Sequence, residues 1–338
     1  MKVFQVDFSR RDTDALSMQE LPAPKPARGE VLVRMRAASL NYRDLLVTRG
    51  LYPAQPGAQK VVPLSDGAGE VVEIGEGVTR FRSGDRVVSS FFQGWIDGVF
   101  RPAHMATALG GAIDGVLAQY AKFSEHGLAP LPDCLSFEQG ATLPCAALTA
   151  WHALFEKGVL LPGESVLVLG TGGVSIFALQ FGRMAGARVI AISSSEAKLA
   201  RAKALGADGL INYTTHPDWE KEVLALTGGA GVDHVVEVGG AGTLPRSLEA
   251  VRAAGRVSLI GVLTGLQDKI NPRPILTKSL TVQGIYVGSR AMLERMIAAV
   301  EANRIEPVID RVFPFDTAPD AYRYLASAQH LGKVVIRF

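Results

Sequence analysis

The stretch Val168-Leu169-Gly170-Thr171-Gly172-Gly173-Val174-Ser175 connects a continuously apolar run, Ser165–Leu169, to a segment with helical spacing, Val174–Ala185. In a strand, turn and helix of this kind, the first glycine allows a sharp turn and the second lets backbone N–H groups approach a pyrophosphate. The amino end of the helix adds a dipole that favours negative charge. The stretch therefore predicts a dinucleotide site, with contacts expected at Gly170, Thr171, Gly172, Gly173 and Val174.

Ser175 stands where such sites often have a third glycine, which packs the helix closely against the strand. Serine is small enough for that position. A glycine pair by itself is also compatible with a plain structural turn, so the elements on either side decide between the two interpretations.

The segments after the glycine turn alternate between apolar strands and helices, as in a parallel sheet with helices on both faces. Ser165–Leu169 is apolar throughout, as expected of a strand buried on both sides. We therefore predict an α/β fold with a Rossmann domain, a doubly wound parallel sheet, at residues 128–271. Its expected strands are Ser165–Leu169, Arg188–Ile192, Gly209–Asn212, Asp233–Val238 and Arg256–Ile260, and its expected helices are Val174–Ala185, Glu196–Leu205, Asp218–Leu226 and Thr243–Ala253.

The region 1–127 contains short apolar runs separated by Gly and Pro, which is typical of a small β-rich body. Within it, residues 91–115 mix aromatic residues, glycines and a proline without a period, and they predict a long loop. The segment 272–338 ends in a strand pattern and is expected to return to the first domain. The predicted catalytic domain is therefore 1–127 together with 272–338.

Composition excludes several classes of protein. The 338 residues exceed the usual size of one hydrophobic core, so two domains are expected. The 35 Lys and Arg against 33 Asp and Glu give a net charge of +2, which is too small to create the positive potential that nucleic-acid binding requires. No apolar run is long enough for a signal peptide or a membrane helix, so we expect a cytoplasmic protein with neither nucleic-acid nor membrane partners. Two cysteines without a Cys-x-x-Cys spacing and six single histidines form no metal-site pattern, and we expect no metal.

The choice of cofactor is made at the end of the second strand, where an acidic residue would accept hydrogen bonds from the ribose hydroxyls of NAD. The chain has serines there instead, followed by a lysine, and Ser193, Ser194 and Lys198 are suited to a 2′-phosphate. This pattern predicts NADP(H). Serines at this position also cap helices, and both roles are compatible.

The chain resembles the medium-chain dehydrogenase/reductase superfamily over essentially its whole length, and most closely its zinc-free, quinone oxidoreductase-type branch. Besides the glycine turn, the matching motifs are Ser39–Asp44, Asp66–Val72, Phe81–Val87 and Ala141–Trp151. The resemblance implies a catalytic domain of chaperonin-10-like β fold, a Rossmann domain, NADPH, a small-molecule substrate and a homodimer.

Zinc alcohol dehydrogenases of this superfamily have a Cys at the position of Asn41, a His-Glu pair at Ser65-Asp66, and a Cys at Cys145. One zinc ligand out of three is therefore retained. A catalytic zinc needs three protein ligands, so the resemblance to that branch does not extend to a metal site. Cys145 is expected to be a small packed residue.

Carried over residue by residue, the resemblance implies positions for further groups around the cofactor. Asn41 and Thr149, with Tyr42 close by, would lie near the nicotinamide; Tyr213 would flank the phosphate of the adenosine, and Lys333 would meet the pyrophosphate. Backbone neighbours of the nicotinamide would be Gly261, Val262, Leu263 and Val287. Taken singly, Asn41 is also explained as a turn residue, Tyr213 as a half-buried strand residue, and Lys333 as a solvated charge.

Without zinc, acceptors that spread the incoming charge are favoured, such as quinones and α,β-unsaturated carbonyls. Candidate hydrogen-bond or proton donors are Asn41, Tyr42 and Tyr52. Phe91, Phe92 and Trp95 are candidates for an apolar substrate pocket, although loop aromatics also cover cores and interfaces. The alternatives are an NADP-dependent alcohol or aldehyde dehydrogenase, and a non-catalytic NADPH-binding structural or regulatory protein.

Overall fold

The computed structural model describes residues 1–52, 57–265 and 269–338, which form two compact units. The first unit contains Met1–Leu148 and Val287–Phe338, and the second contains Thr149–Tyr286. Residues 128–148 thus lie with the β-rich unit, because β8 (Leu128–Pro130) pairs with β6 (Arg86–Ser89). Residues 272–286 lie with the second unit, because β14 (Thr281–Gly284) pairs with β13 (Val251–Leu259).

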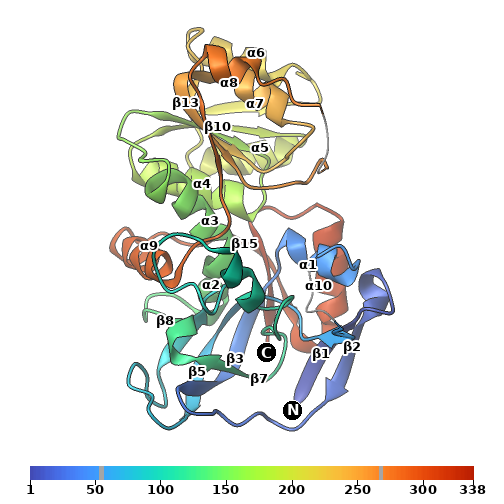
Figure 1. The fold of residues 1–338 in the computed structure, drawn as a ribbon. Coiled ribbons are helices and arrows are strands. Elements are labelled where there is room, and N and C mark those ends of the chain that lie inside the picture. The colour runs from blue at the N-terminus through green and yellow to red at the C-terminus, as the bar shows by residue number, and fades with distance from the viewer. Residues whose placement is uncertain (53–56, 266–268) are drawn as a thin grey trace. The chain divides into compact units, whose positions relative to one another are not determined.

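The second unit is an α/β domain built on a parallel sheet, as the sequence predicts (Figure 1). Its strand order, β11-β10-β9-β12-β13-β14, is that of a doubly wound Rossmann sheet. The first strands are added on one side of β9 and the later ones, from β12 on, on its other side, so the strand order reverses between β9 and β12. The strands are β9 (Ser165–Leu169), β10 (Arg188–Ser193), β11 (Gly209–Asn212), β12 (Val232–Glu237), β13 and β14. The helices are α4 (Gly173–Met184), α5 (Glu196–Ala204), α6 (Trp219–Leu226), α7 (Leu244–Ala250) and α8 (Arg273–Thr277), preceded by α3 (Leu148–Trp151) and the π-helical turn η5 (His152–Glu156).

Continuous apolar runs form this sheet because its strands are covered on both faces. Leu167, Ile190, Val235 and Val257, one from each of four neighbouring strands, are all fully buried in one core cluster. The expected helix Thr243–Ala253 is too long at its carboxyl end. Helix α7 stops at Ala250, because Val251 already pairs with Val232 of β12 as a strand residue.

The first unit is β-rich, and its main sheet contains residues from both ends of the chain (Figure 1). Strand β16 (Lys333–Arg337) pairs with β3 (Glu30–Ser39), and β15 (Ile309–Pro314) pairs with β16. The last strands of the chain thus pair with a strand from its first forty residues, and the part that returns is Val287–Phe338. The other strands are β1 (Lys2–Asp7), β2 (Leu16–Glu20), β4 (Lys60–Val61), β5 (Asp66–Ile74), β6, β7 (Tyr120–Ser124) and β8; the helices are α1 (Tyr42–Thr48), α2 (Phe137–Ala141), α9 (Arg290–Ala302) and α10 (Ala318–Ala326), with the π-helical turn η4 (Leu143–Ala147) and the 3-10 turns η1 (Asp12–Ala15), η2 (Pro102–Thr107), η3 (Glu125–Gly127) and η6 (Phe315–Thr317).

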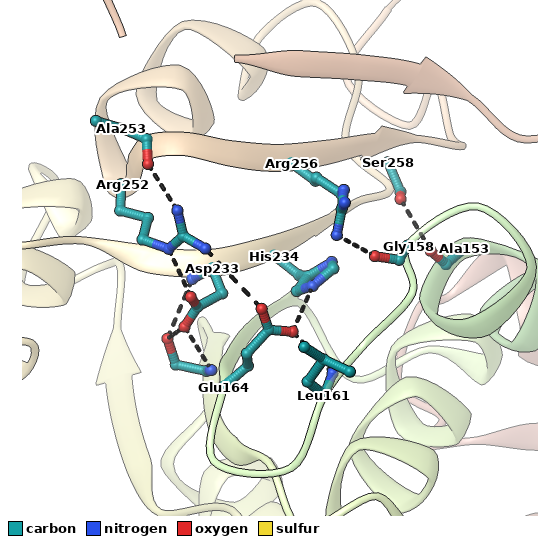
Figure 2. Close-up of polar contacts among 11 residues, drawn as sticks. Ala153, Gly158, Leu161, Glu164, Asp233, His234, Arg252, Ala253, Arg256 and Ser258 are labelled. Carbon is teal, nitrogen blue, oxygen red and sulfur yellow. Dashed lines mark hydrogen bonds and ion pairs between the residues drawn. The ribbon is translucent and has the colours of Figure 1, made fainter. Parts of the chain in front are cut away.

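A polar network lies at the amino ends of strands β9, β12 and β13 (Figure 2). The buried ring of His234 is bonded through Nε2 to Glu164 Oε2 at 3.0 Å, and the same oxygen accepts the N–H of Leu161. Arg252 Nε donates to Asp233 Oδ1 at 2.5 Å, and Ser165 donates to the other Asp233 oxygen. Burial would raise the pKa of Asp233, but these hydrogen bonds hold it below its usual value. The network ties the start of three strands together.

We expect His234→Gln to reduce the loss of stability on acidification. Burial lowers the pKa of His234 and outweighs the bond to Glu164, which raises it; Nδ1 has no partner among the described residues. The unfolded chain therefore takes up a proton first as the pH falls through about 6.5, and stability decreases until the folded pKa is passed. Glutamine can still donate to Glu164 but does not titrate.

Urea unfolding of both proteins between about pH 7 and pH 5 measures this effect. The matched control is His216→Gln, because the His216 ring is exposed beside Glu222. An equally steep acid loss in His234→Gln and the unmodified chain would assign the effect to other groups.

Candidate active site

The glycine turn between β9 and α4 has the geometry that a diphosphate site requires. Gly170 has a φ of +71°, which favours glycine, and its N–H donates to Ile192 O at 2.8 Å. Gly172 precedes the first turn of α4, and a Cβ added at Gly170 or Gly172 would meet no protein atom within 4 Å. Ser175 is buried, and its hydroxyl donates to Leu169 O at 2.6 Å, so serine does pack at the third glycine position. These residues fit a dinucleotide phosphate.

The three serines at the end of β10 differ in their hydrogen bonds and in their exposure. Ser195 caps α5 by accepting the N–H of Lys198, so part of the capping interpretation is confirmed. Ser193 is buried and its Oγ accepts the N–H of Ser195, whereas Ser194 is exposed. Tyr213 follows the neighbouring strand β11, is 41% exposed, and donates its N–H to Ser193 O. The serines after β10 and the first turn of α5, which contains Lys198, thus follow one another where the sequence predicts a ribose phosphate.

A buried carboxylate that the sequence analysis did not single out organises the next loop. Glu237 ends β12, beside the point where the strand order reverses, and it is fully buried. Its Oε1 accepts the N–H groups of Gly239 and Gly240, at 2.7 and 3.0 Å, and the hydroxyl of Thr243 at 2.6 Å. Ser247 donates to Oε2. An acidic residue at the end of an apolar strand, one residue before a Gly-Gly pair, was the signal available in the sequence.

Gly261 lies against this loop, and no larger residue fits there. A Cβ on Gly261 would stand 2.0 Å from Val238 O. The two residues that follow are at the surface, with Val262 36% and Leu263 50% exposed. The predicted contacts at Gly261, Val262 and Leu263 thus follow the end of β13, next to the loop that Glu237 holds.

Asn41 stands directly before helix α1 in the first unit, and two charged side chains hold it. Its backbone N–H donates to Asp44 Oδ2 at 2.7 Å. Lys333 donates from Nζ to Asn41 Oδ1 and to Leu40 O, each at 2.6 Å. Lys333 is 2% exposed, so it is not the solvated charge that the sequence left as an alternative. Burial raises the pKa of Asp44 to about 6, although Arg43 and the Asn41 N–H lower it.

The positions that match zinc ligands do not form a zinc site. Asp66 is fully buried, accepts the hydroxyl of Ser65 at 2.6 Å and the N–H of Cys145 at 3.2 Å, and lies 3.9 Å from Lys333 Nζ. Burial, with Asp66 nearby, holds the pKa of the Cys145 thiol well above its usual value, so in this environment the group is a neutral thiol. No three His, Cys, Asp or Glu side chains gather as a metal cluster within the described residues. The ammonium of Lys333 would repel a divalent cation at this place, and one thiol with one carboxylate does not supply the three protein ligands that a catalytic zinc needs.

The candidate aromatic residues pack against one another and against Arg43. The Arg43 guanidinium carbon lies 4.3 Å from the ring centre of Tyr52 and 4.7 Å from that of Phe91. Phe91, Phe92 and Trp95 are each 1% exposed, and Trp95 Nε1 donates to Gly98 O at 3.0 Å. This burial favours the packing interpretation that the sequence left open. Tyr42, by contrast, is 38% exposed on the first turn of α1.

Two further predicted contacts lie at the boundaries of the units. Thr149 begins the second unit and is 3% exposed, whereas Val287 begins the returning part of the first unit at a φ of +51°. Their roles at the nicotinamide stay predictions.

Comparison with known proteins defines the class. A model described as alcohol dehydrogenase GroES-like domain matches residues 27–133, and one described as zinc-binding dehydrogenase matches residues 173–302. A zinc-type alcohol dehydrogenase-like protein of Schizosaccharomyces pombe is 48% identical over 333 residues, which are 96% of this chain and 95% of that protein. Quinone oxidoreductase of Rattus norvegicus is 28% identical over 332 residues, 96% of this chain and 94% of the relative. A solved structure from Sinorhizobium meliloti 1021, named as an alcohol dehydrogenase, has a TM-score of 0.91 at 43% identity, with both chains covered completely.

A GroES-like unit combined with a Rossmann unit that carries the glycine turn defines an oxidoreductase. The chain belongs to the medium-chain dehydrogenase/reductase superfamily. Among the described residues, no helix has the length and apolar character needed to cross a lipid bilayer.

Proposed function

We propose that this protein is an NADPH-dependent, zinc-free oxidoreductase that transfers a hydride to a quinone or an α,β-unsaturated carbonyl compound. The observation that carries the proposal is that Asn41, Ser65 and Cys145 stand at the three zinc-ligand positions, while the ammonium of Lys333 is bonded to Asn41 and lies 3.9 Å from Asp66. A reaction without a Lewis acid favours acceptors that delocalise the negative charge they receive.

Bound NADPH supplies the hydride, and the residues of the chain bind and orient. The turn at Gly170 and Gly172 and the amino end of α4 receive the diphosphate. Ser193, Ser194 and Lys198 receive the 2′-phosphate, and the loop held by Glu237 adjoins the reversal point of the sheet. The acceptor gains a hydride at carbon, and its oxygen then carries the negative charge. Tyr42 and Tyr52 are the candidate donors of the proton that neutralises this oxygen.

The names of the relatives fit this reaction and its competitor. The rat relative is named quinone oxidoreductase, the Schizosaccharomyces pombe relative is named a zinc-type alcohol dehydrogenase-like protein, and the Sinorhizobium structure is named as an alcohol dehydrogenase. An NADP-dependent alcohol or aldehyde dehydrogenase is therefore the second candidate. A non-catalytic NADPH-binding protein is the third, and it would bind NADPH while reducing no acceptor.

Steady-state assays with a quinone, an enone and, in the reverse direction, a secondary alcohol separate the three. We expect NADPH oxidation with the first two acceptors and little NADP⁺ reduction with the alcohol, in protein whose zinc content is measured in parallel. Faster turnover of the alcohol, or one tightly bound zinc per chain that is required for activity, would reject the proposal.

Lys198→Ala is expected to raise the Kd of NADPH about tenfold and to leave that of NADH unchanged. A charge-assisted hydrogen bond to a phosphate contributes about 1.5 kcal/mol or more, and about 1.4 kcal/mol is a factor of ten. Lys203→Ala on the same helix is the matched control, because Lys203 is exposed in its last turn. Titration of intrinsic fluorescence with each nucleotide measures both constants. Equal effects of Lys198→Ala on NADPH and NADH would remove Lys198 from the phosphate site.

A further inference from the structure

We propose that Lys333 is a positioning residue: it holds the amide oxygen of Asn41, so that the Asn41 amide N–H is a fixed hydrogen-bond donor to a carbonyl oxygen of the bound reactants. The inference rests on the proposed function, which supplies that oxygen. It differs from the role at the pyrophosphate that the family resemblance implies for Lys333.

The identity of the bonded amide atom follows from the chemistry of lysine. An ammonium group has three donors and no acceptor, so the amide atom 2.6 Å from Lys333 Nζ has to be the oxygen. Because the amide is planar, Nδ2 then points away from Lys333. Nδ2 is buried and has no hydrogen-bond partner among the described residues.

The environment of Lys333 leaves its ammonium little freedom to move. It is 2% exposed, donates also to Leu40 O at 2.6 Å, and lies 3.9 Å from the fully buried Asp66. Asp66 is itself held by the Ser65 hydroxyl and the Cys145 N–H. A buried ammonium is retained only when it is paired and hydrogen-bonded, so its position is well determined.

Asn41 stands at the N-cap of α1 and forms a capping box with Asp44. The Asn41 backbone N–H donates to Asp44 Oδ2 at 2.7 Å, and the Asp44 N–H donates to Asn41 O at 3.0 Å. A capping box uses the asparagine oxygen as an acceptor and leaves its Nδ2 group free of the cap. The backbone is thus anchored by Asp44 and the amide oxygen by Lys333, and the two amide protons remain for a ligand.

A buried donor without a partner destabilises the folded chain, so its retention indicates a partner that arrives with the reactants. A carbonyl oxygen is the matching acceptor, and a donor fixed beforehand gains strength as negative charge develops on that oxygen during hydride addition. Two carbonyl oxygens fit this description: that of the acceptor and that of the nicotinamide carboxamide.

A double-mutant cycle tests the coupling of the two residues. We expect Lys333→Met to lower kcat about 10- to 100-fold, and Asn41→Asp, which keeps the oxygen for Lys333 but removes the donor, to lower it at least as much. In the Asn41→Leu background, Lys333→Met should have no further effect on kcat. Independent, multiplying effects of Lys333→Met and Asn41→Leu would overturn the proposal.

Nucleotide binding separates this role from a contact with the pyrophosphate. The probe is 2′-phospho-ADP-ribose, which carries the diphosphate but no nicotinamide, and we expect Lys333→Met to leave its Kd unchanged within about twofold. A rise of tenfold or more would place Lys333 at the pyrophosphate and overturn the proposal. If Asn41→Leu weakens NADPH but not this probe, the carbonyl oxygen is that of the carboxamide; if it weakens neither and only kcat falls, the oxygen is that of the acceptor.

If the protein reduces no acceptor, the proposed function is rejected, but the link between Lys333 and Asn41 can still be tested by a measurement that needs no turnover. The chain has four asparagines, at 41, 212, 271 and 303, so ¹⁵N-asparagine labelling yields four side-chain amide signals. We expect Lys333→Met to shift and broaden the Asn41 signal, identified by its loss in Asn41→Leu, and NADPH or the acceptor to shift it in the unmodified protein. An Asn41 signal indifferent to Lys333→Met in a variant with unchanged Tm would overturn the inference.

Discussion

Gly172→Val is expected to raise the Kd of NADPH at least about 100-fold while lowering Tm by no more than a few degrees. A Cβ at Gly172 meets no protein atom within 4 Å, and its φ of −75° is open to any residue, so the fold tolerates the side chain. Two added methyl groups would project into the space at the amino end of α4, where we propose the diphosphate. If the diphosphate can no longer contact the backbone N–H groups of the turn, the binding free energy of NADPH weakens by about 2.7 kcal/mol or more, which corresponds to the hundredfold change in Kd.

Isothermal titration of both proteins with NADPH, alongside thermal unfolding, measures this effect. The matched control is Gly284→Val in the edge strand β14, where an added Cβ also meets no atom within 4 Å and Gly284 is exposed. That variant should bind NADPH as the unmodified protein does. Unchanged binding in Gly172→Val would move the diphosphate away from this turn.

Ser194→Asp is expected to reverse the preference between NADPH and NADH. Ser194 is exposed at the carboxyl end of β10, where an acidic residue accepts hydrogen bonds from the ribose hydroxyls of NAD. Near a 2′-phosphate the same carboxylate is a like charge, and two charges about 4 Å apart near a protein surface interact by about 4 kcal/mol. We expect a loss of NADPH affinity of at least about 100-fold and a gain in NADH affinity.

The ratio of kcat/KM for the two cofactors, measured at two salt concentrations, checks this prediction, because screening weakens the repulsion. Ala200→Asp adds the same charge to α5 two residues after Lys198, on a different face of the helix, and should leave the ratio unchanged. A ratio that stays constant in Ser194→Asp would show that the ribose lies elsewhere.

The sequence predicted the parts of the site that lie close together along the chain. The glycine turn, the serines after β10 and the residues after β13 each follow a strand of the Rossmann sheet, and the carboxyl ends of parallel strands share one edge. Glu237 was missed because an acid at a strand end has many ordinary explanations. Only the folded loop shows that it accepts two backbone N–H groups and two hydroxyls.

The aromatic residues of 91–115 show the opposite case. Their lack of a period predicted a loop, and the structure has there an irregular segment interrupted by the 3-10 helix η2 (Pro102–Thr107). Periodicity cannot tell a loop that lines a pocket from one that packs on itself. Rings at 91, 92, 95 and 100 contact one another, and their burial places them in a packed cluster. Side-chain contact of this kind depends on the three-dimensional path of the loop.

The sequence by itself determined the family, the α/β fold class and the glycine turn between β9 and α4, because each depends on patterns within a few tens of residues. Tertiary structure alone decided that the ammonium of Lys333 lies between Asn41 and Asp66. Lys333 and Asn41 are 292 residues apart in the chain. They meet because β16, which begins at Lys333, pairs with β3, which ends two residues before Asn41. Buried charges take the partners that the fold brings within reach, and no local pattern records which partners those are.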